Sequence, residues 1–178
     1  MTFKDYILEA MLKDLTVCQH LYEKIPAGSM DKRPREGMRS TRELLNYLAY
    51  IGSGTVHSYI NGGWAKEENV ARMKAVRENA NKIEPEDFIA AIEAEKKKIT
   101  EALAPLTDED LQTIETTHPW GTKVKLIDAL LNNSLKYLAA YRLQLFLYAK
   151  MWGAEISTPN AWRGVDVKPK PWRSQPKP

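Results

Sequence analysis

Apolar residues recur every three or four positions in four separate stretches of this chain, and this spacing constrains the fold more than any other feature. Residues spaced in this way lie on one face of an α-helix, so each stretch predicts a helix with one buried side. Because such helices bury those sides against one another, the pattern predicts an all-α four-helix bundle. The apolar positions of the first stretch are Ile7, Met11, Leu15, Cys18, Tyr22 and Ile25.

Proline and a capping pattern mark the end of the first helix and the start of the second. Pro26 interrupts the first helix, because a proline in a helix interior removes a hydrogen bond and clashes with the preceding turn. A polar loop over residues 29–39 follows. Ser40 and Glu43 then have the spacing of a capping box, which predicts a second helix from Ser40 to just before Asn61.

The third and last helices have similar signals. The segment Glu84-Pro85-Glu86 suits a first turn, where proline is tolerated and acidic side chains face the positive end of the helix dipole. Pro105 closes this third helix. The last and longest helix is predicted over residues 124–152, and Gly153 supplies its C-terminal stop.

The connections are expected to carry less regular structure. The charged segment 64–83 is weakly patterned, with a helical part near Val70–Asn79. Thr107–Asp110 has a second capping signal, which predicts one short helical turn. The segment 113–121 is rich in β-branched residues, and this composition predicts a short extended stretch before the last helix.

A chain of 178 residues suits a single domain with its own core. We expect a bundle over residues 1–153 and an irregular, proline-containing tail over residues 154–178. This tail either packs on the bundle or extends from it, and Trp162 and Trp172 are its candidate anchors.

Charge and cysteine content narrow the expected environment and partners. A net charge of +3 without a basic stripe argues against nucleic-acid binding. Cys18 is the only cysteine, so an intrachain disulfide is excluded and a reducing compartment is favoured. Neither a signal peptide nor a long apolar run is evident. We therefore expect a cytoplasmic protein without a membrane span, and Cys18 as a buried, inert thiol.

Two short segments carry a more specific pattern. The first is Glu43-Leu-Leu-Asn-Tyr-Leu48, and the second is Tyr137-Leu-Ala-Ala-Tyr-Arg-Leu-Gln-Leu145. Together they resemble the helical signatures of the DinB/YfiT-like family, whose members are four-helix bundles. Glu43, Arg142 and Gln144 match the flanking positions of the family pattern.

The resemblance implies a divalent metal held by three histidines, but this chain has tyrosine at all three positions. The site residues implied in this way are Tyr47, Tyr137 and Tyr141. A tyrosine pKa near 10 means that three phenolates would have to form at neutral pH to bind a metal. Neutral imidazole has no such cost. We therefore expect no metal and no other cofactor at the three tyrosines.

Three arrangements of the tyrosines remain open at this stage. They can fill the space of the metal and its ligands as packed rings, or they can line a pocket for a small polar ligand. A metal held by phenolates or relocated to His57 and His118 is the third. His118 and Trp120, in the loop before the last helix, are candidates for the rim of a pocket or for a plug at the end of the bundle.

Two functions follow from these alternatives. The first is a DinB-like protein without the metal, with a ligand-binding or structural role, that forms a homodimer through its helix faces. The second is a DinB-type enzyme, since the family resemblance implies thiol-dependent transferases, isomerases or hydrolases. Such an enzyme would use tyrosine hydroxyls, with Arg142, or a relocated metal.

Overall fold

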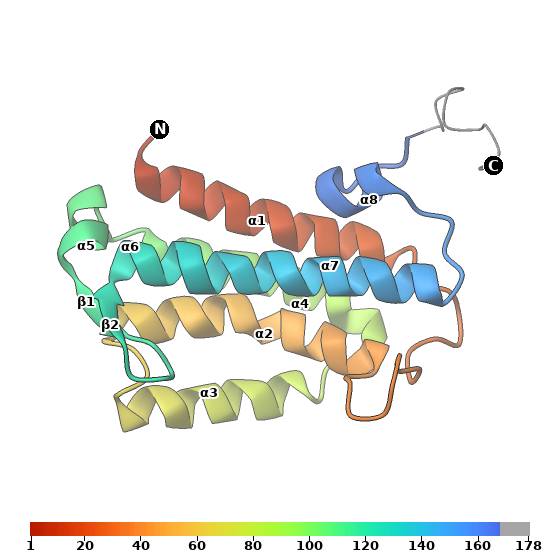
Figure 1. Ribbon diagram of the computed structural model, residues 1–178, viewed down its shortest axis with the longest axis horizontal. Helices are drawn as coiled ribbons and strands as arrows, with labels where there is room; N and C mark the ends of the chain where they lie inside the picture. Colours follow the sequence, from red (N-terminus) through yellow and green to blue (C-terminus); the bar gives the residue numbers. More distant parts are fainter. Residues whose placement is uncertain (168–178) are drawn as a thin grey trace.

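The computed structural model describes residues 1–167 and has the all-α architecture expected from the sequence (Figure 1). Four long helices form the bundle. Helix α2 packs against α4 and α7, and α1 packs against the same two helices from the other side. The four helices are α1 (Phe3–Tyr22), α2 (Thr41–Ile60), α4 (Phe88–Leu103) and α7 (Lys136–Met151).

Shorter elements surround this bundle. Helix α3 (Glu67–Ala80) lies along the outer side of α2, and a two-stranded hairpin closes one end of the molecule (Figure 1). The hairpin pairs β1 (Glu115–Thr117) with β2 (Lys123–Lys125), so the predicted extended stretch in 113–121 is confirmed. The other short elements are η1 (Pro85–Asp87), α5 (Asp108–Thr113), α6 (Leu126–Ala129), η2 (Leu130–Leu135) and α8 (Thr158–Arg163).

The predicted capping boxes are present. The backbone amide of Ser40 donates to Glu43 Oε2 at 2.6 Å, and the amide of Glu43 donates to Ser40 Oγ at 3.2 Å. Thr107 and Asp110 make the same reciprocal contacts at the start of α5. Each box satisfies amides that the first turn of a helix leaves free, so the sequence signal and the observed start agree.

The last helix differs from its prediction. Residues 124–152 were expected to form one continuous helix, but β2 includes residues 123–125, and a π-helical segment, η2, separates α6 from α7. A π-helix accommodates more residues per turn and changes which side chains face the core. Asn133 Oδ1 and Ser134 Oγ are buried in η2 without a hydrogen-bond partner in the described part of the chain.

Part of the predicted tail also has regular structure. Helix α8 packs on α1 and α7, and the side-chain amide of Asn160 lies 3.0 Å from Nε2 of His20. The Arg142 guanidinium lies 4.6 Å from the ring centroid of Trp162, and this contact places Trp162 against the bundle. Trp172 lies outside the described residues. Within residues 1–167, no helix combines the length and apolar character needed to cross a membrane.

Two glycines allow α2 to pack closely against the neighbouring helices. A Cβ atom at Gly52 would lie 3.0 Å from Ile99 Cδ1, and one at Gly54 would lie 2.8 Å from Met73 Sδ. Both glycines therefore allow the close helix approach suggested by the sequence. Cys18 is fully buried as predicted, and burial raises the pKa of its thiol.

A buried carboxyl group joins α4 to α2. Glu95 is fully buried and accepts hydrogen bonds of 2.6 Å from both the amide and the hydroxyl of Ser53. Burial raises the pKa of Glu95 from its ordinary value of 4.5 to about 7, although the contacts with Ser53 act in the opposite direction. The cost of removing the charged form from water therefore exceeds the gain from these hydrogen bonds.

This raised pKa predicts a pH-dependent stability. The folded protein keeps a proton on Glu95 that the unfolded chain releases above about pH 4.5, so the free energy of unfolding falls as pH rises toward 7. Urea denaturation between pH 5 and pH 8 should reveal a loss on the order of 2 to 3 kcal/mol from this group. Glu95→Gln should remove most of that slope. Glu93→Gln, a change at an exposed position of the same helix, should leave it unchanged.

Candidate functional site

The three tyrosines singled out by the sequence lie together where α2 packs against α7. The ring centroids of Tyr47 and Tyr141 are 4.5 Å apart, and those of Tyr141 and Tyr137 are 6.3 Å apart. Tyr50, one turn along α2, adds an edge-to-face contact with Tyr47 at 5.4 Å. These tilted and edge-to-face geometries are favourable for aromatic pairs. We call Tyr47, Tyr50, Tyr137 and Tyr141 the tyrosine cluster.

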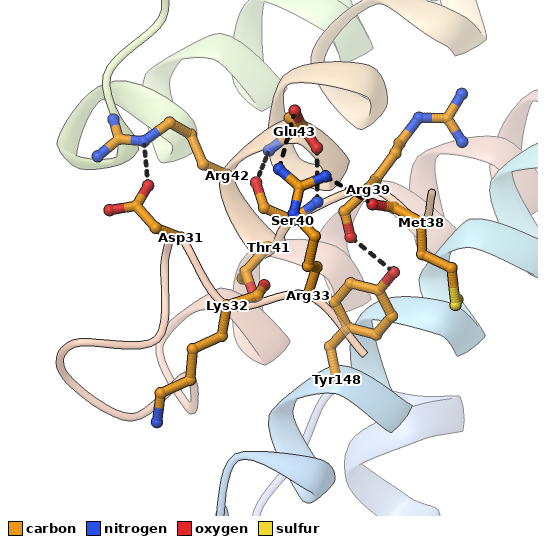
Figure 2. A network of polar contacts seen from close by, with 10 residues as sticks. All are labelled: Asp31, Lys32, Arg33, Met38, Arg39, Ser40, Thr41, Arg42, Glu43 and Tyr148. Atoms are coloured by element: carbon orange, nitrogen blue, oxygen red, sulfur yellow. Dashed lines mark hydrogen bonds and ion pairs between the residues drawn. The ribbon is translucent and has the colours of Figure 1, made fainter. Parts of the chain in front are cut away.

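An arginine that the sequence did not single out lies on this cluster. The guanidinium carbon of Arg39 is 4.0 Å from the ring centroid of Tyr47 and 5.4 Å from that of Tyr141, which is cation–π geometry. The Arg39 carbonyl accepts a 2.9 Å hydrogen bond from the Tyr148 hydroxyl, so the backbone is anchored on α7. Figure 2 shows this bond and shows the Arg39 guanidinium without a contact to the other residues drawn.

Burial keeps the central phenol protonated. It is the largest effect that raises the pKa of Tyr47, and the neighbouring Tyr141 raises it further. The positive charge of Arg39 acts in the opposite direction but is a smaller effect. A phenol with a raised pKa is a hydrogen-bond donor and acceptor at neutral pH, and it is a poor ligand for a divalent metal.

Two cavities adjoin the tyrosine cluster, and Tyr47, Tyr50 and Arg77 line both of them. The first has a volume of about 570 Å³ and contains charged groups, whereas the second, about 390 Å³, is mostly apolar. The first is also lined by Arg33, Gly37, Met38, Arg39, Glu43, Glu78 and Asn81. The second is also lined by Ile51, Trp64, Val70, Met73 and Lys74.

The two candidates for a pocket rim, His118 and Trp120, line neither of these cavities. His118 is buried at the hairpin end of the bundle, where Nδ1 lies 3.0 Å from the Tyr59 hydroxyl. Its Nε2 lies 3.7 Å from Oδ2 of Asp128. Trp120 is 64% exposed and stacks on the His118 ring at 4.5 Å. His118 therefore joins the hairpin to α2 and α6.

The flanking residues of the family pattern have structural contacts. Arg142 points away from the tyrosine cluster and forms a buried ion pair with Asp14 of α1 at 3.3 Å. It also donates a 2.8 Å hydrogen bond to the carbonyl of Ala161. Gln144 donates to the Tyr148 hydroxyl at 2.9 Å. Arg142 is therefore not the cation that accompanies the tyrosines, and Arg39 has that position instead.

The described residues contain no group of three or more histidine, cysteine, aspartate or glutamate side chains that could hold a metal ion. His57 lies on α2, and burial followed by the charge of Arg72 lowers the pKa of its imidazole. Within residues 1–167, neither His57 nor His118 belongs to such a group of possible metal ligands.

The fold of this bundle has a counterpart among solved structures. The chain is similar to the crystal structure of a protein from Exiguobacterium sibiricum 255-15, described as a provisional member of the DinB family. The TM-score is 0.69 at 22% sequence identity, and the match covers 90% of this chain and 99% of that one. No protein-family model and no curated protein sequence matches the chain. The fold is therefore DinB-like, as the sequence resemblance implied.

The buried ion pair predicts that Arg142 is structurally important. Asp14→Asn should lower the free energy of unfolding by about 3 kcal/mol, because it leaves a buried guanidinium without its negative partner. Urea denaturation at pH 7 measures this change. Asp31→Asn is the matched control, since Asp31 makes an exposed ion pair with Arg42 and should change stability little. Equal effects of the two substitutions would contradict a structural role for the buried pair.

Proposed function

We propose that this DinB-like protein binds a small polar ligand in the cavity beside Tyr47 and does so without a divalent metal. The observation that supports this most is the position of Arg39. Its guanidinium packs on the phenols that stand where the sequence resemblance implies metal-binding histidines.

The donor chemistry argues against a metal at the tyrosine cluster. Burial raises the pKa of Tyr47, so binding a divalent cation would require removal of a tightly held proton. The guanidinium 4.0 Å from the same ring carries a permanent positive charge and would repel the ion. Both effects disfavour a divalent cation at the tyrosine cluster.

The cavities favour ligand binding over a purely structural role. A volume of about 570 Å³ is within the usual range for small-molecule sites. Five of its ten lining residues are charged and two are tyrosines, so the lining suits a polar ligand. The tyrosine rings pack closely on one another, yet Tyr47 and Tyr50 still contribute to the walls of the cavities.

An enzymatic role is the second candidate, and it is supported by the position of Tyr50, which lines both cavities together with Arg77 and the first together with Arg39. Burial raises the pKa of Tyr50, and the guanidinium groups of Arg77 and Arg39 only partly offset this effect. A phenol beside cations can act as a general acid or stabilise a developing anion, because the cations stabilise its ionised form. Tyr50 is therefore the tyrosine that we assign to such chemistry in a transferase, isomerase or hydrolase.

Self-association through a helix face is part of the proposal. Leu143, Leu147 and Met151 follow one another at four-residue spacing along α7, and all three side chains are exposed. Residues four apart share a helix face, so they form an apolar stripe on the outside of the bundle. We assign this stripe to a homodimer contact.

Metal content tests the metal-free proposal. Elemental mass spectrometry of the purified, tag-free protein should find much less than one zinc, nickel, manganese or iron ion per chain. The triple variant Tyr47→His/Tyr137→His/Tyr141→His is the positive control, because imidazole suits these ions. Adding Arg39→Ala to the triple variant should raise its metal affinity further, since this change removes the neighbouring positive charge.

A stoichiometric metal in the wild-type protein would contradict the proposal. Its loss on substitution of Tyr47 would then place it at the tyrosine cluster. Its loss on substitution of His57 or His118 would indicate the relocated site instead.

The apolar stripe predicts a concentration-dependent dimer. Light scattering coupled to gel filtration should give twice the chain mass for the wild-type protein and one chain mass for Leu147→Lys, because a buried unpaired charge opposes association. Phe3→Lys, at the exposed start of α1, is the matched control and should remain dimeric. A wild-type monomer at all concentrations would refute the assignment.

A further inference from the structure

The first cavity is lined by more arginines than have an ion-pair partner. Arg33, Arg39 and Arg77 all line it. Arg33 donates to the carbonyl of Met38 at 2.9 Å and faces Glu43 at 3.5 Å (Figure 2). Within residues 1–167, Arg39 and Arg77 form no ion pair. Two guanidinium groups at this cavity therefore remain available to a bound anion.

The acidic residues of the cavity do not cancel this charge. Glu43 accepts from the amide of Ser40 at 2.6 Å and faces Arg33, so its carboxylate already has partners. Glu78 also lines the cavity from α3, where its side chain is exposed to solvent. Three arginines and two glutamates line the cavity, so its formal charge is +1, and the charge near Tyr50 comes from Arg39 and Arg77.

The second cavity continues from the same residues with a different chemistry. Tyr47, Tyr50 and Arg77 belong to both linings. Beyond them the walls are largely apolar side chains from α2, α3 and the turn between these two helices, namely Ile51, Trp64, Val70 and Met73. A ligand that passes over the two tyrosine rings would therefore have a charged end beside the arginines and an apolar end beside these residues.

We propose that the ligand is an amphipathic organic anion. Its oxyanion head, a carboxylate or a phosphate monoester, binds Arg39 and Arg77. A hydrocarbon or aromatic body lies over Tyr47 and Tyr50 in the second cavity. The guanidinium fork matches both oxyanions geometrically, and the aromatic walls match an apolar body. This assignment rests on the proposed ligand-binding function and specifies its ligand class.

Matched eight-carbon probes test the proposal on the full chain. Isothermal titration at low salt should detect binding of octanoate, octyl phosphate or both, and their relative affinities identify the preferred head group. Octan-1-ol should bind about tenfold more weakly or worse, because it lacks the charge that the arginines recognise. Octyltrimethylammonium should show no binding. Acetate and inorganic phosphate should bind far more weakly than the octyl compounds, because they bury no apolar surface.

Arginine substitutions locate the site. Arg39→Gln and Arg77→Gln should each weaken binding of the preferred octyl anion by about tenfold or more and leave the affinity for octan-1-ol unchanged. Arg35→Gln is the matched control, because Arg35 is an exposed arginine in the same loop and lines neither cavity. It should bind the anion as the wild-type protein does. Circular dichroism verifies that each variant is folded.

Two results would overturn the proposal. Equal affinity for octanoate, octyl phosphate and octan-1-ol would show that the head charge is not recognised. Failure of every octyl compound to bind would show that the two cavities do not accept an amphipathic anion. Neither result decides whether the protein is metal-free, because metal content is measured without any of these probes. Failure of the anion proposal is therefore distinguishable from failure of the metal-free part of the proposed function.

Discussion

The burial of α2 among three other helices is the constraint on which the rest of this structure depends. Helix α2 contacts α4, α3 and α7, so its backbone must approach its neighbours closely. Gly52 and Gly54 leave no room for larger side chains beside Ile99 and Met73. The capping box at Ser40 sets where the helix starts. These features place Tyr47 against Tyr141 of α7 and leave Tyr47 and Tyr50 lining the cavities.

The same placement accounts for the chemistry of the site. The Tyr47 phenol, half-buried between two helices, resists ionisation because burial raises its pKa, and the Arg39 guanidinium from the preceding loop packs on its ring. A positive charge supplied by a side chain needs no metal ligands and persists at every physiological pH. In our proposal, Arg39 supplies a fixed cation beside the tyrosines, and Arg77 of α3 extends the positive region to the boundary between the polar and apolar cavities.

Much of the fold could be predicted from the sequence because its signals are local. Helical periodicity and the capping pairs at Ser40 and Thr107 depend on residues within a few turns, and α2 and α5 start where the capping pairs predicted. The π-helical segment was missed because it spans only six residues, too few to interrupt the apolar pattern of the helices on either side. The cation on the tyrosine cluster was missed because Arg39 reaches Tyr47 through a loop, and sequence spacing says nothing about such contacts. Arg142, adjacent to Tyr141 in sequence, instead pairs with Asp14 across the bundle.

Anomalous diffraction from crystals of the wild-type protein grown with excess zinc would locate any zinc ion bound at the tyrosine cluster. We expect no anomalous peak among Tyr47, Tyr137 and Tyr141, with the Arg39 guanidinium in place over the Tyr47 ring. A zinc peak bonded to the phenolic oxygens, with Arg39 displaced from the cluster, would contradict this expectation. In that case the tyrosines would be metal ligands.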